Sequence, residues 1–475
     1  MGSALVQPAQ SAQPAQPTSA SQTAEAVVAD SQRTPDVGAE SPEQSSPEQS
    51  SLEQSALEQS SPESLSSVAS SETVFVAVRE DDLPTTTLEA ATVPPTETAV
   101  EPADELSDAP LALSSVPFGR DCTVKVTAVG DILIHDTVRR YASVTDGKGK
   151  TTYDFRPNLQ YVKPILEKGD LVLANLENPL AGDDRKLSGY PMFNAPQQLA
   201  ADLKSVGFTT MLLTNNHSMD RGWSGLESTI NAVKEAGLEY VGAYLSEEDK
   251  KNRLISVYNG VRIGLLAYTY GLNGFPGPKP GEEYKLGLID KEMILADLRL
   301  VREMGADFVI LSLHFGNEYE RKPNRHQTSL VAELLAGDPE TGLVGPDLIL
   351  GHHPHVVQPF VMTEESRDSP AQAVMYSLGN FMSGQPFPYT YIGLILEGEL
   401  TLTADGRRKV GPFNFTPTWC FRGTAGGKNY HRVIPMEAGA ADPAAFGLTA
   451  SQGRKMAESF EEMRKHVLSM SAQSN

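Results

Sequence analysis

Five short apolar runs, each followed closely by side chains that can bind a metal, constrain this sequence more than any other feature. The runs are VKVTAVG, LVLANL, TTMLLT, FVILSL and DLILG. They are rich in β-branched residues and bounded by Gly, Asp or Asn, which is typical of strands covered on both faces. Helical patterns lie between most of them, at 196–206, 225–236, 291–304 and 324–335. Strands that alternate with helices predict an α/β fold.

Further strand patterns lie outside these units, and they extend the predicted sheet. The candidates are 254–258, 263–269, 373–377, 392–396 and 413–420. Two pairs of them are spaced as hairpins, which favours a sandwich of mixed sheets with helices outside over a simple doubly wound sheet. An amphipathic pattern at 450–467 predicts a last helix on the surface.

The first 115 residues have a different composition from the rest of the chain. They contain nineteen acidic residues, only Arg33 and Arg79 as basic residues, and Phe75 as their one aromatic residue. Such a segment buries too little apolar surface to offset its conformational entropy, so we predict a disordered acidic tail. Most of the net charge of −22 belongs to this tail. We therefore expect three parts: a spacer at 1–115, a domain at 120–435 and a C-terminal helical extension at 436–475.

Pentapeptides repeat between Ser41 and Ser64 in the tail, and their period fits neither helix nor strand. This pattern indicates a solvated spacer rather than a partner-binding repeat. The sequence as given contains no signal-peptide pattern and no apolar run long enough to span a membrane. A long spacer ahead of a domain is nevertheless typical of a surface protein. We expect a cell-surface or extracellular location, membrane-associated through an anchor that this sequence does not contain.

Charge and cysteine content exclude some functions and leave others open. The part after residue 115 is nearly neutral, which disfavours a nucleic-acid partner because such proteins present a basic face. Cys122 and Cys420 either form a disulfide or remain two lone buried thiols. There is no P-loop motif and no GxSxG motif, which argues against a P-loop ATPase and an α/β-hydrolase.

Polar side chains follow each of the five apolar runs. They are Asp131 after the first run, Asn175 and Glu177 at the second, Asn215, Asn216 and His217 after the third, His314 after the fourth, and His352, His353 and His355 after the fifth. Singly, each fits a turn, a loop or a satisfied core histidine. Together they predict a set of oxygen and nitrogen ligands at one edge of a sheet, beyond the strand ends where ligands bind in α/β folds. Carboxylate, amide and imidazole ligands without thiolate suit one or two catalytic divalent ions, with Mn, Zn or Fe favoured.

The order of these motifs resembles a known family. GDILIHD, DLVLANLENPL, TTMLLTNNHSMDRG, VILSLHFGNEYE, LILGHHPHVVQPF and YSLGNFM look together like the bacterial capsule synthesis protein CapA family. That family is associated with poly-γ-glutamate production and belongs to the calcineurin-like metallophosphoesterase superfamily. The resemblance spans residues 124–381, and it implies a metallophosphoesterase-like β-sandwich of mixed sheets flanked by helices.

The resemblance also implies roles for the residues that match its motifs. The implied metal ligands are Asp131, Asn175, Glu177, Asn216, His314, His353 and His355. His217 is implied to lie near the scissile phosphate as a catalytic residue. Asp220, grouped with His217, and Glu318 are expected to orient ligands. His352 is expected to stand aside.

Two positions depart from the superfamily pattern. Leu133 stands where the first motif, Asp-x-His, has its histidine, and His135 lies two residues further on. Asn175 stands where the bridging aspartate is found, and it is a neutral, weaker ligand. Either Glu177 substitutes for that aspartate, or the domain holds one ion, or catalysis is degraded.

Three functions remain open. The first is a metal-dependent hydrolase or transferase of the cell envelope, acting on a phosphoester or on an anionic polymer such as poly-γ-glutamate. The second is a non-catalytic accessory protein of a membrane synthesis and export complex, which keeps the fold to bind polymer or partner. The third, a cytoplasmic nucleotide phosphatase, fits the acidic spacer poorly. Basic residues near the motifs either meet a polyanion or are solvated surface charge: Arg139, Arg140, Arg185, Lys186, Arg321, Lys322 and Arg325.

Overall fold

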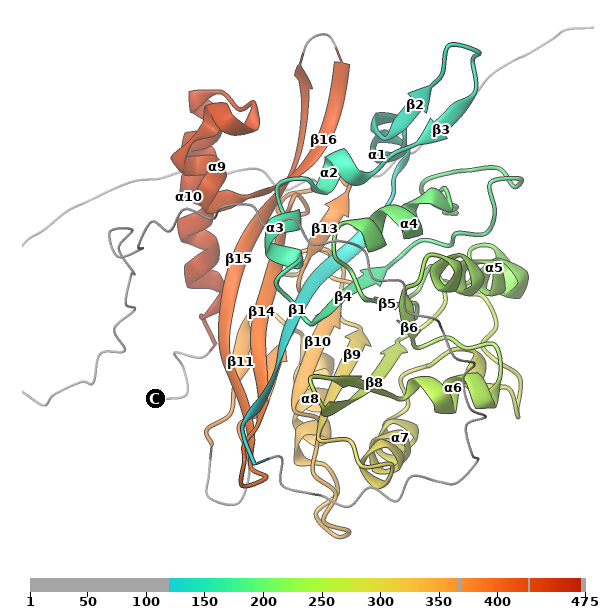
Figure 1. Ribbon diagram of the computed structural model, residues 1–475, viewed down its shortest axis with the longest axis vertical. Helices are drawn as coiled ribbons and strands as arrows, with labels where there is room; N and C mark the ends of the chain where they lie inside the picture. The colour runs from blue at the N-terminus through green and yellow to red at the C-terminus, as the bar shows by residue number, and fades with distance from the viewer. Residues whose placement is uncertain (1–118, 366–369, 426–427, 471–475) are drawn as a thin grey trace, which may run out of the picture. The chain divides into compact units, whose positions relative to one another are not determined.

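The computed structural model describes residues 119–365, 370–425 and 428–470, and the predicted disordered tail at 1–115 lies outside them (Figure 1). Residues 105–475 form one compact unit, while the predicted boundaries at 120, 435 and 475 stay a prediction. Two mixed sheets dominate the described part of the chain. The α/β sandwich predicted from the apolar runs is confirmed.

The larger sheet has eight strands in the order β16-β15-β14-β1-β4-β5-β6, with β13 paired to β1. Its strands are β1 (Cys122–Leu133), β4 (Leu171–Leu176), β5 (Thr210–Leu212), β6 (Glu239–Val241), β13 (Asn380–Ser383), β14 (Ile392–Leu402), β15 (Arg408–Ala425) and β16 (Lys428–Pro435). The strands β1, β4, β5 and β6 are parallel, whereas β14, β15 and β16 run antiparallel to their neighbours. The predicted strands at 392–396 and 413–420 lie in β14 and β15, which pair antiparallel with one another.

The smaller sheet has six strands in the order β11-β12-β10-β9-β8-β7. Its strands are β7 (Ile255–Tyr258), β8 (Val261–Thr269), β9 (Phe308–His314), β10 (Leu348–His352), β11 (Phe360–Met362) and β12 (Ala373–Met375). The four inner strands are parallel, and β7 and β11 close the two edges antiparallel. A separate two-stranded ribbon is formed by β2 (Ser143–Thr145) and β3 (Thr151–Tyr153).

Helices cover the outer faces of the sheets (Figure 1). They are α1 (Asp136–Tyr141), α2 (Arg156–Leu159), α3 (Lys163–Leu166), α4 (Gln198–Ser205), α5 (Gly222–Glu235), α6 (Glu247–Arg253), α7 (Lys291–Glu303), α8 (Arg325–Ala336), α9 (Met436–Ala441) and α10 (Ala450–Val467). The last helix has the bounds predicted from its amphipathic pattern, and it packs on β15. No helix in the described ranges combines the length and hydropathy that crossing a membrane requires.

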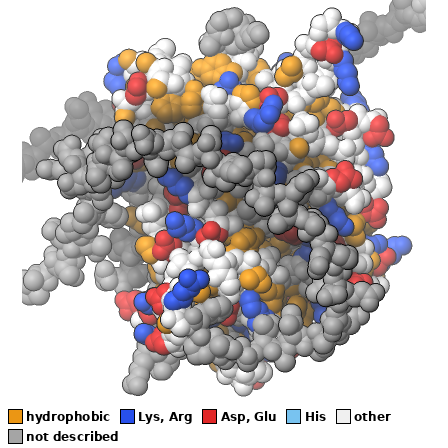
Figure 2. Space-filling view, viewed as in Figure 1, with side chains coloured by type: hydrophobic (Ala, Val, Ile, Leu, Met, Phe, Trp, Pro, Cys, Tyr) orange, Lys and Arg blue, Asp and Glu red, His pale blue; other side chains and the backbone are white. Residues whose placement is uncertain are grey.

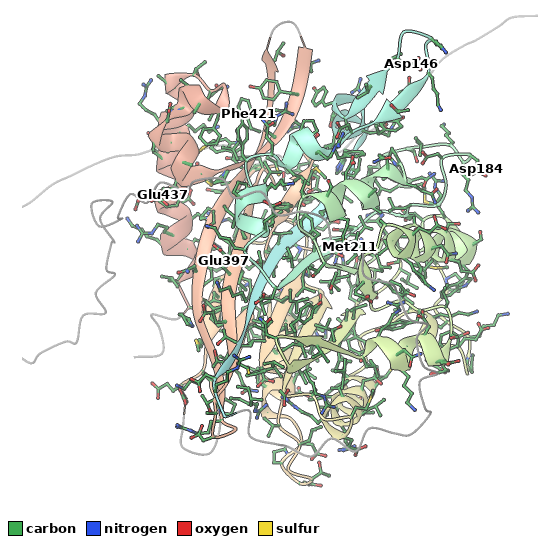
Figure 3. All side chains as sticks on the ribbon, viewed as in Figure 1. Asp146, Asp184, Met211, Glu397, Phe421 and Glu437 are labelled. Atoms are coloured by element: carbon green, nitrogen blue, oxygen red, sulfur yellow. The ribbon has the colours of Figure 1, made fainter. Side chains whose placement is uncertain are left out.

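Three apolar cores result from the alternation of side chains along each strand. In β9, Phe308 and Ile310 point into the core between the two sheets, while Val309 and Leu311 point into the core beneath α7 and α8. A third core lies between the larger sheet and α1 to α5. Side chains fill these spaces, as Figure 3 shows around Met211 on β5. Sheets covered on both faces explain why the runs are continuously apolar.

His431 on β16 is a buried histidine that joins β16 to neighbouring elements. Its Nε2 lies 3.1 Å from the carbonyl oxygen of Ser383, and its Nδ1 lies 3.4 Å from Nδ2 of Asn158. A neutral ring that donates from Nε2 and accepts at Nδ1 satisfies both contacts. Burial lowers the pKa of His431 to about 4.

This histidine makes stability depend on pH. Because the pKa of the folded state lies below the usual value of about 6.5, the unfolded chain binds more protons between pH 6.5 and 4, so stability falls as the pH drops through that window. When the pH falls from 7 to 5, the wild type should lose more unfolding free energy than His431→Gln does. We predict that the two losses differ by about 1–2 kcal/mol. Urea unfolding at the two pH values measures this difference. The control is His326→Gln on the exposed face of α8, and an equal effect of both variants would contradict the prediction.

Candidate functional site

Strand register brings the predicted site residues together. Asp131 on β1 is paired with Asn175 on β4, and on its other side with Asn380 on β13. In the smaller sheet His314 on β9 is paired with His352 on β10. The prediction of one edge of a single sheet is wrong, because these strands belong to two stacked sheets. The sandwich brings the two sets of strand ends together face to face.

A bulge in β1 determines where Asp131 lies. The register of β1 shifts between Val129 and Asp131 against β4, and again just after Asp131 against β13. The chain passes so close to Gly379 at this point that a Cβ on Gly130 would lie 1.8 Å from the Gly379 carbonyl oxygen. The Asp131 amide donates to that same oxygen at 2.9 Å. Gly130 therefore permits the close approach, and the bulge fixes the position of the Asp131 carboxylate.

The Asn175 side chain donates hydrogen bonds to both buried carboxylates. Its Nδ2 lies 2.8 Å from Oδ1 of Asp131 and 3.3 Å from Oε2 of Glu177. Its Oδ1 accepts from Nδ2 of Asn215 at 3.2 Å, which fixes the orientation of the amide. Asn175 thus lies among the predicted ligands, and it contributes hydrogen-bond donors between two acids rather than a third negative charge.

Asp131 and Glu177 are fully buried and respond to that burial in opposite ways. Burial alone would raise the pKa of Asp131, but the hydrogen bond from His352 and the charges of His352 and His355 hold it well below its ordinary value. Burial, followed by repulsion from Asp131, raises the pKa of Glu177 to about 8. His355 would have a low pKa from burial, yet Glu177 and Asp131 raise it to about 9. The two acids and His355 therefore shift one another's pKa in addition to the effect of burial.

His314 and His353 are neutral imidazoles beside these acids. Burial lowers the pKa of both rings well below the ordinary value, and His314 contributes to the shift at His353. Nε2 of His314 lies 3.4 Å from Oε1 of Glu177 and 3.0 Å from Oδ1 of Asn216. Neutral imidazole is the form of histidine that binds a metal.

Several buried polar atoms of this cluster have no hydrogen-bond partner. They are Oδ2 of Asp131, Oε1 of Glu177, Nε2 of His352 and Nδ1 of His353. An imidazole nitrogen of His355 lies 3.2 Å from the Asp131 atom, but not in hydrogen-bonding geometry. Buried polar atoms are rarely left unpaired. Carboxylate and imidazole donors that converge in this way fit a divalent cation, as the chemistry of the set predicts.

Three groups of side chains have ligand atoms within 4.8 Å of one another. They are Glu177, His314 and His353; Asp131, Glu177 and His355; and Glu318, His353 and His355. Glu318 is exposed, whereas the other members are buried. Every residue predicted as a metal ligand belongs to one of these groups or, like Asn175 and Asn216, bonds directly to a member.

His217 and Asp220 form a pair at the side of the cluster. Nδ1 of His217 lies 2.9 Å from Oδ2 of Asp220, and that oxygen also accepts from the Phe193 amide at 2.7 Å. Both side chains are buried. The contact holds the imidazole with Nδ1 protonated and leaves Nε2 free for other chemistry.

The structure separates the roles of His352 and His135: His352 contacts Asp131, whereas His135 contacts backbone groups. The expectation that His352 stands aside is wrong, because its Nδ1 lies 3.2 Å from Oδ1 of Asp131. The His-x-His motif needs only two histidines, so the motif alone does not indicate His352. The position of His352 at the end of β10 nevertheless directs its side chain towards Asp131. His135 stays outside, since its Nδ1 contacts the Leu133 carbonyl and the Gly384 amide.

Sequence reasoning missed two polar residues that complete the network, Asn380 and Asn273. Asn380 places Oδ1 3.1 Å from Nδ1 of His355. Asn215, which is among the predicted polar residues, holds the amide of Asn175. Asn273 accepts from Nδ2 of Asn216 at 3.2 Å, and its backbone has φ of +49°. The YSLGN motif pointed to Asn380, but nothing in the sequence around Asn273 separates it from an ordinary turn residue.

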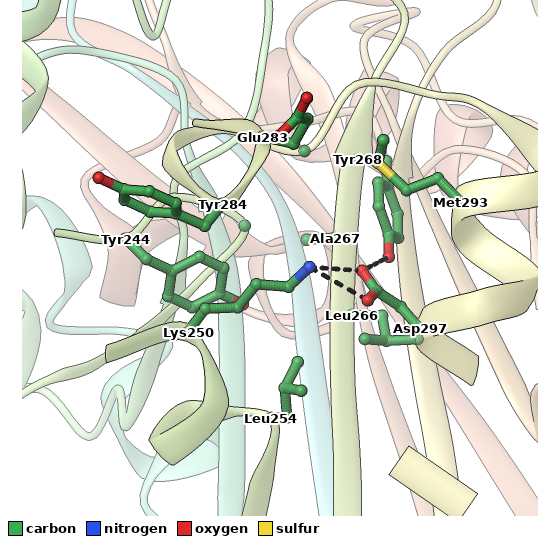
Figure 4. Close-up of a pocket in the computed structure, with 12 residues that line it drawn as sticks. Tyr244, Lys250, Leu254, Leu266, Ala267, Tyr268, Glu283, Tyr284, Met293 and Asp297 are labelled. Carbon is green, nitrogen blue, oxygen red and sulfur yellow. Dashed lines mark hydrogen bonds and ion pairs between the residues drawn. The ribbon is translucent and has the colours of Figure 1, made fainter. Parts of the chain in front are cut away.

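The cysteines and one internal cavity are not part of this site. Cys122 and Cys420 are both free, buried thiols, so the disulfide alternative does not hold in this structure. A cavity of about 10 Å³ lies beside β8 and α7, where Lys250 and Asp297 are paired at 2.8 Å and Tyr268 donates to the same carboxylate (Figure 4). That space holds about one water molecule, and its polar groups satisfy one another.

The fold and its donor set define the class of this protein: an α/β sandwich with carboxylates, amides and imidazoles gathered between its two sheets. Within that class, the chain belongs to the bacterial capsule synthesis protein PGA_cap family, whose model matches residues 125–385. The resemblance predicted from the six motifs is thereby confirmed.

Curated relatives agree with this membership. The chain is 30% identical over 318 residues to the capsule biosynthesis protein CapA of Bacillus anthracis. The match covers 64% of this chain and 70% of that protein. It is 29% identical over 300 residues to the PGA biosynthesis protein CapA of Bacillus subtilis strain 168, with 62% and 72% covered.

Solved structures of similar shape are more distant. The NAD nucleotidase NadN of Haemophilus influenzae is 12% identical, with a TM-score of 0.37, and the match covers 72% of this chain and 56% of that one. The calcineurin-like phosphoesterase YfkN of Bacillus subtilis is 15% identical, with a TM-score of 0.34, and the match covers 62% and 90%.

The contact between Asn273 and Asn216 generates a prediction about metal affinity. Asn273→Gly keeps the positive φ but removes the acceptor that orients the Asn216 amide, so we predict that Mn²⁺ binds about tenfold more weakly. Asn273→Asp keeps the acceptor and tolerates the backbone, and we expect it to retain most of the affinity. Calorimetric titration with Mn²⁺ measures the difference.

A matched control is available for this experiment. Asn259, in the turn between β7 and β8, has φ of +52° and bonds only to the Thr123 carbonyl. Asn259→Gly should leave Mn²⁺ affinity unchanged. Equal loss in both glycine variants, or no loss in Asn273→Gly, would show that Asn273 does not position Asn216.

Proposed function

We propose that this chain is a metal-dependent, phosphoesterase-type hydrolase that acts in the synthesis or export of capsular poly-γ-glutamate. The observation that carries the proposal is the place of Glu177, which belongs to two of the three ligand groups. One group adds His314 and His353, and the other adds Asp131 and His355. A carboxylate shared in this way suits two divalent ions held side by side, which is the arrangement that hydrolases of phosphoesters use.

Glu177 takes the bridging role that the family pattern gives to an aspartate at position 175. Asn175 cannot bridge with a charge, and its amide nitrogen faces Asp131 and Glu177. Two buried acids repel one another, as the raised pKa of Glu177 indicates. A divalent cation relieves that repulsion because it stabilises both ionised carboxylates.

The proposed chemistry assigns separate tasks to the side chains. Asp131, Glu177, Asn216, His314, His353 and His355 would hold the metal. When bound, a divalent ion polarises a phosphoryl oxygen and lowers the pKa of a water molecule for attack. His217, oriented by Asp220, would act as general acid in its doubly protonated form: Nε2–H donates a proton to the leaving-group oxygen, and the proton released by the attacking water restores that form. His352 holds Asp131 in place.

The substrate class and location rest on the relatives and on the sequence. The relatives carry the names capsule biosynthesis protein and PGA biosynthesis protein, which supports an anionic polymer or a phosphoester linked to its synthesis. We place the protein at the cell surface, beside a membrane synthesis complex, with the acidic segment at 1–115 as its spacer.

Metal content and hydrolysis test the catalytic proposal together. We predict about two Mn²⁺ ions per chain in the wild type and loss of both in Glu177→Gln, because the shared ligand loses its charge. His217→Gln should keep its metal and hydrolyse bis(p-nitrophenyl) phosphate at least about a hundredfold more slowly. His326→Gln, exposed on α8, is the control. One ion per chain would refute the bridge, and full activity in His217→Gln would refute the catalytic role.

An accessory role without catalysis is the second candidate, and the first motif favours it. Leu133 is buried where the superfamily pattern has a histidine, and the nearby His135 bonds to backbone rather than to the cluster. A site with fewer imidazoles and a neutral Asn175 binds metal less tightly.

Capsule formation in cells separates the two candidates. A strain that carries Asp131→Asn with His353→Ala should make no capsule if hydrolysis is required, because both changes remove metal ligands. The chain must accumulate to the wild-type level, as an immunoblot of surface and cytoplasmic fractions measures. Normal capsule with a metal-free protein would support the accessory role, and cytoplasmic protein alone would refute the proposed location.

A further inference from the structure

Aromatic side chains are exposed at one place on the described surface. Four of them are exposed among residues 119–365, 370–425 and 428–470, namely Tyr190, Tyr270, Tyr319 and Phe387. Their exposed fractions are 74%, 48%, 38% and 45%. They come from four different loops, which follow β4, β8, β9 and β13. We refer to these four residues as the aromatic rim.

Every member of the rim adjoins an imidazole of the candidate site, directly or through one ring. The Tyr270 ring lies 4.6 Å from the His353 ring, and the Tyr319 ring lies 6.3 Å from the His355 ring. Phe387 packs on Tyr319 at 4.7 Å. Tyr190 packs on Phe193, whose ring meets His217 edge-on at 4.8 Å. Separate loops therefore bring aromatic rings beside the imidazoles of the site.

Backbone conformation indicates that the rim is held in place. Tyr319 and Tyr389 have φ of +67° and +64°, which is unusual for aromatic residues. The Tyr319 amide donates to the Pro354 carbonyl at 2.8 Å, and Arg321 lies 3.9 Å above the Tyr389 ring. Such strain persists where the surroundings enforce it, and it concentrates at functional sites.

Several arginines near the rim are held by other groups. Arg321 bonds to Glu462 on α10 at 2.6 Å, and Arg139 bonds to Asp136 at 2.8 Å. Arg221 donates to the carbonyl oxygens of Phe193 and Met192. On the face seen in Figure 2, Lys and Arg are interspersed with Asp and Glu. The rim itself offers apolar ring faces next to the site.

We propose that the aromatic rim is a binding subsite for a planar ring carried by the phosphoester substrate. The ring packs against Tyr319 and Phe387 while the phosphoryl group lies at the metal-ligand cluster. Exposed aromatic faces suit this ligand because stacking buries their apolar area and matches the ring quadrupoles. The inference rests on the proposed phosphoryl chemistry of the site and adds the class of leaving group.

Two phosphonates that differ by one ring test the subsite without turnover. We predict that phenylphosphonate binds the Mn²⁺-loaded protein about tenfold more tightly than methylphosphonate, because only the first can stack. Phe387→Leu and Tyr319→Leu keep apolar bulk but remove a ring, so each should reduce that ratio severalfold and leave methylphosphonate affinity unchanged. Calorimetry measures the affinity of both phosphonates for the wild type and for each variant.

The control and the outcomes separate this proposal from the one it rests on. Val257→Ala changes an exposed apolar residue of β7 and should keep the wild-type ratio. Equal affinities of the two phosphonates in the wild type would overturn the aromatic subsite while the phosphoryl site stands. A ratio that persists in both leucine variants would do the same. Failure of both phosphonates to bind the Mn²⁺-loaded wild type would overturn the phosphoryl site itself.

Discussion

Two carboxylates buried within one cluster are the constraint on which the rest of this structure depends. Asp131 and Glu177 have no exposed surface, and together they would carry two negative charges into a medium of low dielectric constant. Polar side chains around the two acids offset part of this desolvation free energy. The Asn175 amide donates to both acids, and His352 and His355 lie beside Asp131. A divalent cation would supply charge, which hydrogen bonds do not, and the unpaired carboxylate and imidazole atoms of the cluster suit such an ion.

The sandwich is the means by which the chain assembles this cluster. Parallel strands in each sheet end at the same side, and stacking the two sheets lets acids from β1 and β4 face imidazoles from β9 and β10. The bulge at Asp131 then adjusts one carboxylate by a single residue, which the absence of a side chain at Gly130 permits. The exact position of the Asp131 carboxylate therefore depends on backbone geometry. Strand pairing within the two sheets holds the other ligand-bearing segments in place.

Much of the fold was predictable because its signal is local, and the missed parts are those that depend on packing. Apolar runs marked β4 and β9 to within a residue, since strands covered on both faces are apolar at most positions. The stacking of the two sheets has no local signal in the sequence. The sequence therefore predicts a single sheet edge where the edges of two sheets meet. His352 and Asn273 were missed for the same reason: each resembles an ordinary turn or strand residue until tertiary structure places it against Asp131 or Asn216.

The amide at position 175 has a consequence for how a substrate is held. An aspartate there would add one negative charge to the two acids of the cluster, and two divalent ions would then be more nearly neutralised. With Asn175, bound ions would keep more of their positive charge, which would weaken their retention but strengthen their attraction for a phosphoryl oxygen. Tight recognition then requires contacts outside the metal, because the nearby arginines are paired. The exposed rings of Tyr319 and Phe387 are the groups placed to supply them.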